Sequence, residues 1–443
     1  MKIKNSTLIK INVSTLILTC TITNNALAGD NYLYNQTGSQ LGIQSSGAVA
    51  GIPEPGTLFY NPAGLSDLTE RSSSLDILVY NPHLTFKNQG SVDAGGAPLK
   101  GNNGGQGGIS ALVPNLFVAT PLDSHWSVGL GTFTPFGMGV HYKDGWVGRY
   151  VVNKATFGTM NANPSVSYKF NDNFAIGGGV SAEFVEVKLK SKVDFGAIGA
   201  AFSIPGAIPQ TADGSSTFYG HNWGYGANIG AILKLNHETR FGLAFRSGIT
   251  HKIKHARVTF RKSALGQAIS AATGKFNNTK GKMRMKLPGS IIFGFAHDLT
   301  KELTLRGDLT FMNWKRFKEL RVVFKNPLQP DNVTPNGYRN SFIYTLGMSY
   351  KLNQDLVLEG ALGYDQTPVK KHALNPIHPD ASKFNVSCGA IYDFNEKTRI
   401  SFGYLHGFVM NRKMNLTSQF AGTLKGKSKL NMNIFGAQML IKF

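Results

Sequence analysis

Polar and apolar residues alternate along much of the chain after residue 70. In residues 341–352 the even positions are all large and apolar, and the odd positions are small or polar with one exception. Because successive side chains of a strand point to opposite faces, this pattern predicts strands with one apolar face. The same alternation recurs in residues 303–311, 355–365, 384–394, 400–408 and 435–443.

A soluble β-sandwich and a membrane β-barrel share this alternation, and three further features favour the barrel. Tyrosine and phenylalanine cluster near the expected strand ends, as in interfacial aromatic girdles. Short turns at 171–173, 236–237 and 395–397 alternate with long connections, as periplasmic turns alternate with extracellular loops. The last strand ends on the terminal aromatic Phe443, which resembles the signal read by the outer-membrane barrel assembly machinery.

We therefore expect an all-β fold, a 14-stranded antiparallel transmembrane β-barrel over residues 71–443, because bacterial single-chain barrels use even strand numbers. The strands are expected to begin near residues 73, 107, 125, 157, 174, 223, 238, 281, 303, 341, 355, 384, 398 and 429. No segment after the N-terminal region approaches the roughly 18–20 apolar residues of a membrane helix.

The N-terminus resembles an export signal. Three lysines precede a short apolar stretch, and Ala26-Leu27-Ala28 fits an A-x-A cleavage pattern, so we expect residues 1–28 to be removed as a signal peptide. A lipoprotein signal ending at Cys20 is the alternative, but Thr19 is larger than the residue that usually precedes such a cysteine. Export predicts a Gram-negative outer-membrane location for the barrel.

Residues 29–70 lack the alternation and carry frequent glycine and proline, which prevent long strands. A barrel of this width leaves a lumen that must be plugged if it is not an open pore. The apolar side chains of the segment, such as Leu41, Ile43 and Leu58, favour packing, so we expect these residues to form a hatch inside the barrel. A disordered periplasmic tail is the alternative.

The formal net charge of +21 could attract nucleic acid, an anionic membrane surface or an anionic ligand. Export and the lack of a nucleic-acid-binding motif argue against nucleic acid. The mature chain keeps one cysteine, Cys388, which excludes an internal disulfide and a cysteine metal site. The sequence has no G-x-S-x-G, H-E-x-x-H or Walker motif, so we expect no enzyme, no metal and no cofactor.

The segment Phe59–Gly64, with Asn61-Pro62-Ala63 at its centre, resembles the hatch motif of the FadL family of outer-membrane hydrophobic-compound transporters. Trp146–Tyr150 and Asn161–Tyr168 are similar to the W-x-G-R-Y and N-x-N-P-S-x-x-Y signatures of that family. One departure is His378, which stands where the family usually has Ile before Pro-Asp. The resemblance implies a fourteen-stranded barrel with an N-terminal hatch, ligand capture outside, an internal apolar site and exit sideways through the wall.

The expected third strand, Trp126–Tyr142, contains Thr134-Pro135-Phe136-Gly137. Proline removes a ladder donor and belongs at an edge or a bulge, so we interpret this sequence as a kink that opens the wall. We expect a bulky Gly137→Arg substitution to block uptake. An outer bulge is the alternative. The predicted hatch and gate contact joins Asn61, Pro62 and Ala63 to Thr134, Pro135 and Gly137.

Two further sets of residues are candidates for ligand binding. The segment 195–208 is too apolar for an ordinary exposed loop and predicts a capture groove, with packing of a helix on the rim as the alternative. A buried carboxylate needs a cation, and alternative roles for the candidate cations are salt bridges to loop acids or to lipopolysaccharide phosphate. The groove candidates are Ile198, Phe202, Ile204 and Ile208, and the cation candidates are Arg149, Lys325 and Arg339.

The sequence therefore predicts passive uptake of long-chain fatty acids and similar hydrophobic compounds by lateral diffusion through the barrel wall. The alternatives are uptake of aromatic hydrocarbons, a general porin and a structural barrel. An outer-membrane lipase is disfavoured by the missing catalytic motif. Expected partners are the ligand, outer-membrane lipid, lipopolysaccharide and the assembly machinery.

Overall fold

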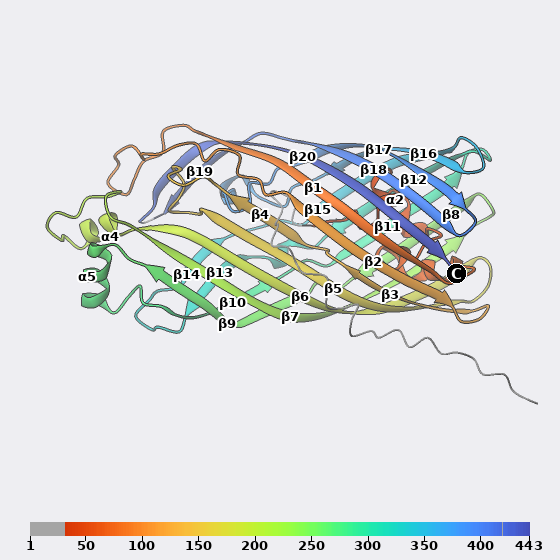
Figure 1. Ribbon diagram of the computed structural model, residues 1–443, viewed down its shortest axis with the longest axis horizontal. Coiled ribbons are helices and arrows are strands. Elements are labelled where there is room, and N and C mark those ends of the chain that lie inside the picture. The colour runs from red at the N-terminus through yellow and green to blue at the C-terminus, as the bar shows by residue number, and fades with distance from the viewer. Residues whose placement is uncertain (1–31, 419) are drawn as a thin grey trace, which may run out of the picture.

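The computed structural model describes residues 32–418 and 420–443, and most of this chain forms one closed antiparallel barrel (Figure 1). Strand β1 (Ser72–Asn88) pairs with β20 (Gly422–Lys442) over its whole length and closes the barrel. The expected signal peptide, residues 1–28, lies outside the described residues.

The barrel has 14 strands, as predicted, although six of them are interrupted and the described residues therefore contain 20 strand segments. The other uninterrupted strands are β2 (Ala111–Pro121), β5 (Lys154–Lys169), β6 (Phe174–Asp194), β7 (Asp213–Lys234), β16 (Leu356–Asp365) and β17 (Lys383–Asn395). The interrupted strands are β3 (Trp126–Phe133) with β4 (Gly137–His141), β8 (Thr239–Arg246) with β9 (Thr250–Arg261), β10 (Thr279–Lys286) with β11 (Ser290–Asp298), β12 (Leu303–Met312) with β13 (Glu319–Phe324), β14 (Asn332–Pro335) with β15 (Ser341–Lys351), and β18 (Thr398–Val409) with β19 (Arg412–Ser418).

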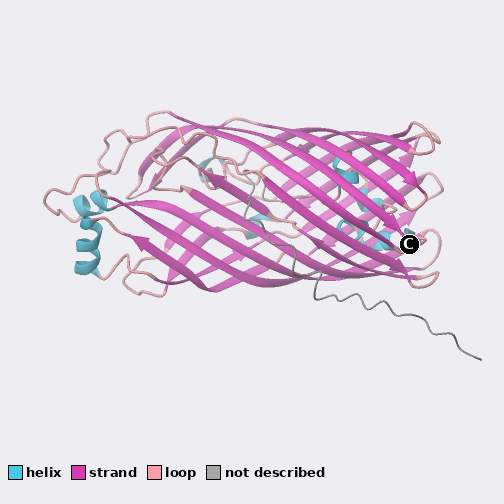
Figure 2. Ribbon diagram, viewed as in Figure 1, coloured by secondary structure: helices cyan, strands magenta, loops and turns pink. Residues whose placement is uncertain are grey.

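The two ends of the barrel differ in their connections (Figure 2). Turns at 170–173, 235–238 and 352–355 join strands at the end that carries the C-terminus, which we call the turn end. Long loops occupy the opposite end, the loop end, where α4 (Phe195–Ala201) and α5 (Ala264–Thr273) pack together. None of the described helices is long and apolar enough to cross a membrane.

The polarity of the wall reverses along its length. In β8 and β11, near the turn end, outward side chains such as Phe245 and Phe293 are large and apolar, and inward positions such as Ala244 and Ser290 are small. In β9 and β10, near the loop end, the apolar side chains face inward and the basic side chains face outward. The buried apolar members there are Ile253, Ala256, Val258, Met283 and Met285.

This reversal explains two of the three largest errors in the predicted strand starts, and the third is the strand of β14 and β15, which begins at Asn332 rather than near residue 341. Strand β7 begins at Asp213 rather than near residue 223, and β20 begins at Gly422 rather than near residue 429. The extra residues of β7 present polar groups such as Thr217 and Tyr219 outward, and those of β20 present Lys425 and Lys427. The outward apolar stripe that reveals a membrane strand is therefore missing in these parts of the two strands.

The segment before β1 fills the lumen of the turn half, as expected for a hatch. It forms α2 (Gly38–Leu41), the 3-10 helix η1 (Ala48–Ala50), α3 (Thr57–Tyr60) and the 3-10 helix η2 (Pro62–Asp67). Nearly all of these residues are buried, and α2 contacts β17, β18 and β20 while η2 contacts β5, β6 and β7. The hatch therefore touches the wall on several sides.

Two short 3-10 helices lie elsewhere: η3 (Trp314–Arg316) in the break between β12 and β13, and η4 (Lys371–Ala373) in the loop between β16 and β17. The η4 loop, residues 366–382, turns back into the barrel, and Val369, Leu374 and Ile377 in it are buried. This loop covers the lumen of the loop half.

Candidate functional site

Asn61 fastens the hatch to the wall. Its buried side-chain amide donates to the carbonyl oxygens of Val49 (2.7 Å) and of Ala231 in β7 (3.0 Å). Its side-chain oxygen accepts from the backbone N–H of Ala63 (3.0 Å) and caps η2. Gly177 of β6 permits close approach, because a Cβ there would lie 2.4 Å from the Ala63 nitrogen.

The expected contact of Asn61, Pro62 and Ala63 with the Thr134–Gly137 kink is therefore wrong. The turn packs on β6 and β7, where Gly177 and Gly230 leave room for it. The sequence could not place the turn, since small residues that permit a close approach occur in many of the strands.

The kink itself lies between β3 and β4 and leaves a gap on the side of β2. The β2–β3 ladder ends at Leu116 opposite Thr132, and the next described contact on that side is the bridge between Gly108 and Val140. On the other side, the backbone N–H of Phe136 donates to the Thr159 hydroxyl (3.0 Å), which keeps the kink attached to β5.

Residues 32–36, which we call the closing segment, occupy this gap. The backbone N–H of Leu33 donates to the carbonyl of Pro135 (2.9 Å), and the Gln36 amide donates to the carbonyl of Thr134 (2.9 Å). Tyr32 forms an antiparallel bridge with Phe136, and their ring centroids are 5.5 Å apart. The gap lies at the kink from which a local opening of the wall was expected, and that opening stays a prediction. The hatch residues in the gap differ from the expected ones.

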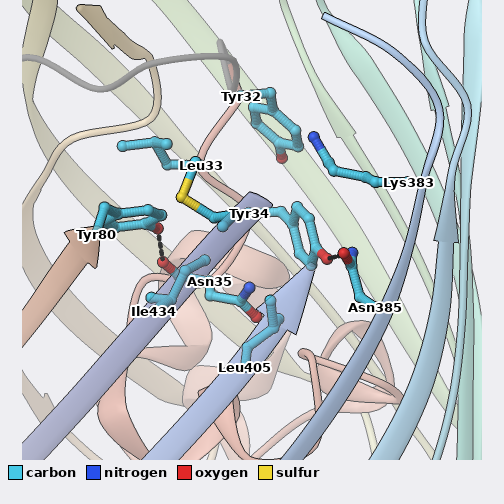
Figure 3. Close-up of a pocket in the computed structure, with 10 residues that line it drawn as sticks. Tyr32, Leu33, Tyr34, Asn35, Tyr80, Lys383, Asn385, Leu405 and Ile434 are labelled. Atoms are coloured by element: carbon cyan, nitrogen blue, oxygen red, sulfur yellow. Dashed lines mark hydrogen bonds between the residues drawn. The ribbon is translucent and has the colours of Figure 1, made fainter. Parts of the chain in front are cut away.

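Side chains from other strands hold the far side of the closing segment (Figure 3). Asn115 of β2 donates to the Gln36 carbonyl (2.7 Å), and Tyr80 of β1 donates to the Asn35 carbonyl (3.2 Å). Asn385 of β17 donates to the Tyr34 hydroxyl (3.0 Å). These hydrogen bonds hold the closing segment in the gap. Bonds to water can replace them when the segment withdraws.

Gly137 has a geometry that the sequence did not predict. It lies opposite Gly158 in the β4–β5 ladder, whereas the next pair, Met138 and Phe157, lines an internal pocket. Because alternate residues point to opposite faces, a side chain at position 137 leaves on the face away from that pocket. An arginine at position 137 therefore points away from the chamber, and the expectation that Gly137→Arg blocks uptake at the kink stays a prediction.

The lumen of the loop half is an apolar chamber above the kink. The roof is tied down by Tyr142, whose hydroxyl donates to the Pro376 carbonyl (3.0 Å). Burial lowers the pKa of His378 in this roof to about 4, so the imidazole is neutral at pH 7. The pocket in the chamber is lined by Met138, Phe157, Val187, Leu189, Met285, Leu287, Trp314, Phe317, Leu320, Ile377 and His378.

Arg246 lies between the hatch and the chamber. Its inward position in β8 places the guanidinium 5.0 Å from the ring centroid of Phe59 and 5.3 Å from that of Phe133. One terminal nitrogen donates to the Phe59 carbonyl (2.8 Å), and the other, Nη1, has no hydrogen-bond partner among the described residues. Arg246 was not among the cations expected to bind a ligand, although its spacing from Gly242 and Ala244 marks an inward position.

The three predicted carboxylate ligands lie in three separate places, none of them among the residues that line the chamber pocket. Arg149 is buried and binds Asp213 (3.1 Å), the Lys100 carbonyl (2.8 Å) and the Tyr150 hydroxyl (2.7 Å), so it ties loops together. Lys325 is exposed on the outside of the wall next to Lys280. The prediction that these residues bind a ligand inside the lumen is wrong for Arg149 and Lys325.

Arg339, the third candidate, is exposed in the loop that follows β14 and donates to the Thr367 carbonyl (3.4 Å). It therefore joins two loops at the mouth of the barrel. Loop residues point where their loop packs rather than where strand alternation places them, so their positions could not be inferred from alternation. No group of three or more His, Cys, Asp or Glu side chains in the described parts of the chain is arranged to hold a metal.

The four predicted groove residues divide into two pairs. Ile198 is buried in the packing of α4 against α5, and Ile204 is half-buried against the same cluster. Phe202 and Ile208 are more than half exposed. Packing on the rim, the alternative, accounts for the first pair, and an exposed apolar surface accounts for the second.

The family model that describes outer membrane protein transport proteins (OMPP1/FadL/TodX) matches residues 19–443. A putative outer membrane protein of Neisseria meningitidis is 24% identical over 90% of this chain and 91% of its own length. The long-chain fatty acid transport protein of Escherichia coli is 22% identical over 83% of this chain and 86% of its own length.

Solved structures share the fold. A FadL homologue of Pseudomonas aeruginosa superposes with a TM-score of 0.86, 22% identity and coverage of 93% of this chain and 100% of its own. The Pseudomonas putida toluene transporter TodX superposes with a TM-score of 0.69, 18% identity and coverage of 93% of this chain and 99% of its own.

Proposed function

Since this chain belongs to the family of outer membrane transport proteins that includes FadL and TodX, we propose that it takes up long-chain fatty acids and similar hydrophobic compounds. The protein is a transporter of the Gram-negative outer membrane. We propose further that its work is passive binding and release, without a chemical step.

The observation that carries the proposal is the reversed polarity of the loop half. A water-filled pore has a polar interior, whereas this lumen is lined by apolar side chains such as Met138, Phe157 and Met285. Each methylene of a ligand gains about 0.8 kcal/mol when it leaves water for such a surface. A chain of many methylenes is therefore a better occupant than an ion or a sugar.

The route that we propose begins at the exposed Phe202 and Ile208 of the loop end, which offer apolar surface to an arriving ligand. The ligand then passes into the chamber under the 366–382 loop. It leaves sideways at the kink after the closing segment withdraws from Pro135. Arg246 is positioned beside this exit, and its unpartnered nitrogen suits a carboxylate.

A reversible crosslink tests the exit. Tyr32 and Phe136 face each other across an antiparallel bridge, so Tyr32→Cys with Phe136→Cys places two thiols within reach of a disulfide. Cys388 is changed to Ser in this variant because it is a free thiol. We expect oxidation to lower uptake of a fluorescent long-chain fatty acid into cells at least tenfold, and reduction to restore it.

The matched control joins two wall strands below the kink. Val118 and Leu130 are opposite each other in the β2–β3 ladder and exposed on the outside, so their crosslink leaves the gap unchanged. Uptake through this control should not depend on oxidation. Unchanged uptake through an oxidised Tyr32–Phe136 crosslink of confirmed yield would refute lateral exit at the kink.

Aromatic hydrocarbons are a second candidate ligand, favoured by the resemblance in fold to a toluene transporter. A neutral hydrocarbon needs no cation. Arg246→Gln should therefore lower uptake of a fatty acid and leave uptake of toluene unchanged if both ligands use this route.

A general porin and a structural barrel remain the other candidates from the sequence. The hatch is hydrogen-bonded to β1 through Gly38 and Asp76 (2.8 Å), to β16 through Gln44 and Ala361 (2.9 Å), and to β17 through Gly42 and Ser387 (2.8 Å), which argues against an open pore. Large, steady conductance of the purified protein in planar bilayers would favour the porin. We propose outer-membrane lipid, lipopolysaccharide and, through Phe443, the barrel assembly machinery as its other partners.

A further inference from the structure

A row of cations crosses the outside of the wall in the loop half. The strand registers place Lys188 of β6 opposite Tyr219 of β7, Tyr219 opposite Arg257 of β9, and Arg257 opposite Lys280 of β10. Lys325 follows β13 and donates its backbone N–H to the Lys280 carbonyl (2.8 Å). The four cations, all exposed, form one lateral line that we call the basic row.

Protein charges do not neutralise this row. None of its four cations has a carboxylate within 4.0 Å among the described residues, and the nearby Glu186 accepts a hydrogen bond from Tyr219 (2.9 Å). A further like-charged pair, Lys252 and Arg284, lies in the same two strands. Like charges directly opposite in a sheet are destabilising, so the basic row is costly unless an anion binds to it.

The turn end has a different arrangement. Its charged side chains include acid–base pairs such as Lys169 with Asp172 (2.7 Å) and Arg399 with Asp393 (2.7 Å). Exposed cations also occur there at Lys301, Lys351 and Lys397, each on or beside a short turn rather than in a cross-strand row. The uncompensated line is therefore a feature of the outward face of the loop half.

The level of the basic row relative to the membrane follows from the aromatic residues below it. Trp223 and Tyr225 of β7 are exposed on the same face, and the Trp223 ring lies 5.3 Å from that of Phe184. Exposed tryptophan and tyrosine mark the interface of a bilayer. Tyr219 is four residues beyond Trp223, roughly 14 Å along the strand at about 3.4 Å per residue and about 10 Å along the membrane normal for a strand tilted by about 45°. The basic row therefore lies on the water side of the interfacial aromatic residues, beyond the hydrocarbon core.

We propose that the basic row binds the phosphate groups of lipopolysaccharide in the outer leaflet. Lipopolysaccharide is already a proposed partner of the protein, and the basic row is the surface that would bind it. This inference rests on the outer-membrane location and is independent of the transported ligand. Several cations in a line that spans about four strand spacings, each about 4.8 Å, suit a head group with more than one phosphate. Arg257 and the lysines supply the charge, and the aromatic residues below them contact the acyl chains.

Native mass spectrometry of the detergent-purified full chain tests this proposal, with bisphosphorylated lipid A as the probe. The variant Arg257→Gln/Lys280→Gln/Lys325→Gln removes three adjacent cations. We expect its affinity for lipid A to fall on the order of ten- to a hundredfold, since each basic residue near an anionic surface contributes a several-fold gain. Lipid A stripped of its phosphates should bind the unchanged protein about as weakly as lipid A binds the variant.

The matched control, Lys301→Gln/Lys351→Gln/Lys397→Gln, removes the same charge from the turn end and should leave the affinity unchanged. Heat-modifiable migration on gels verifies that every variant forms a folded barrel. Equal loss in both variants would mean that net charge, not the basic row, attracts the lipid, and this outcome overturns the proposal. Equal binding of phosphorylated and dephosphorylated lipid A does so as well.

Discussion

The two halves of the barrel wall follow one rule of alternation with opposite polarity. In the turn half the outward side chains are apolar and the inward ones are small or polar, because lipid surrounds the wall and the hatch fills the lumen. In the loop half the outward side chains of β9 and β10 are basic and the inward ones are apolar. The same strands therefore serve a lipid environment at one end and an apolar lumen at the other.

Apolar side chains have a different role in each half: they contact lipid in the turn half and line the chamber in the loop half. Basic groups on the outward face of the loop half suit phosphate head groups and water, whereas folding alone does not require the lumen behind them to be apolar. The breaks at 247–249 and 287–289 separate the two regimes in neighbouring strands. These breaks allow the face presented to the lumen to change character within one barrel strand.

The largest expected effect comes from inverting the polarity of the chamber. Met285→Glu places a carboxylate where a buried apolar side chain lines the pocket, so it repels a fatty acid and disfavours its methylenes. We expect uptake of a long-chain fatty acid by cells to fall more than tenfold. The neighbouring Arg284→Gln makes the same change in net charge on the outward face and should leave uptake within about twofold.

Equal uptake by these two variants, each present in the outer membrane as a folded barrel, would contradict the functional difference between the two faces. A loss in both would indicate that the strand, rather than its lumen face, is sensitive to change.

An intermediate effect is expected from acid at the roof of the chamber. Burial holds the pKa of His378 at about 4, against 6.5 for the free side chain, so a loosened loop binds a proton that the packed loop does not. The stabilisation is fully present above pH 6.5 and is lost as the pH falls toward 4, to an extent of roughly 3 kcal/mol.

Hydrogen exchange of residues 371–381 measures this loss when it is compared at pH 7 and pH 4.5 after correction for intrinsic rates. Exchange should accelerate in the unchanged protein and much less in His378→Ile. If the two proteins responded alike to acid, protonation of His378 would not be the cause.

The smallest effect is expected from weakening the attachment of the hatch to the wall. Asn61→Ala removes two hydrogen bonds to backbone carbonyls and leaves those acceptors buried, at a cost of about 1–3 kcal/mol. We expect a lower thermal midpoint in detergent and brief ionic currents in planar bilayers as the hatch loosens. Asn431→Ala, at an exposed position in β20, should change the midpoint little.

Much of the barrel could be predicted from alternation and turns. The strands that begin at Phe174, Leu303 and Thr398 start at the expected residues, because an outward apolar stripe and a short turn mark each of them. The first parts of β7 and β20 carry no such stripe, and their starts were missed by several residues. The apolar stripe that marks a strand in the sequence thus arises from contact with lipid and not from strand formation itself.

The site was predicted less well, for a related reason. Pro135 identified the kink because its missing N–H is a local property. The partner of the kink is not local: Leu33 and Gln36 close the gap, and nothing in their sequence distinguishes them from other hatch residues. Arg149 and Lys325 have the positive charge that binding of a carboxylate requires. Arg149, however, pairs with Asp213 among the loops, and Lys325 faces outward.

The alternation of faces, the turns, the kink at Pro135 and the segment unfit for strands follow from the amino-acid sequence, since each depends on residues near one another in the chain. Three other features emerge from the folded barrel: which face of each strand meets the lumen, which part of the hatch fills the gap, and which cations align across strands. Those outcomes depend on register and on contacts between residues far apart in the chain, such as Gln36 with Thr134 and Arg257 with Lys280. Barrel closure fixes these contacts together, because a shift of one strand would move all of its side chains to the opposite face.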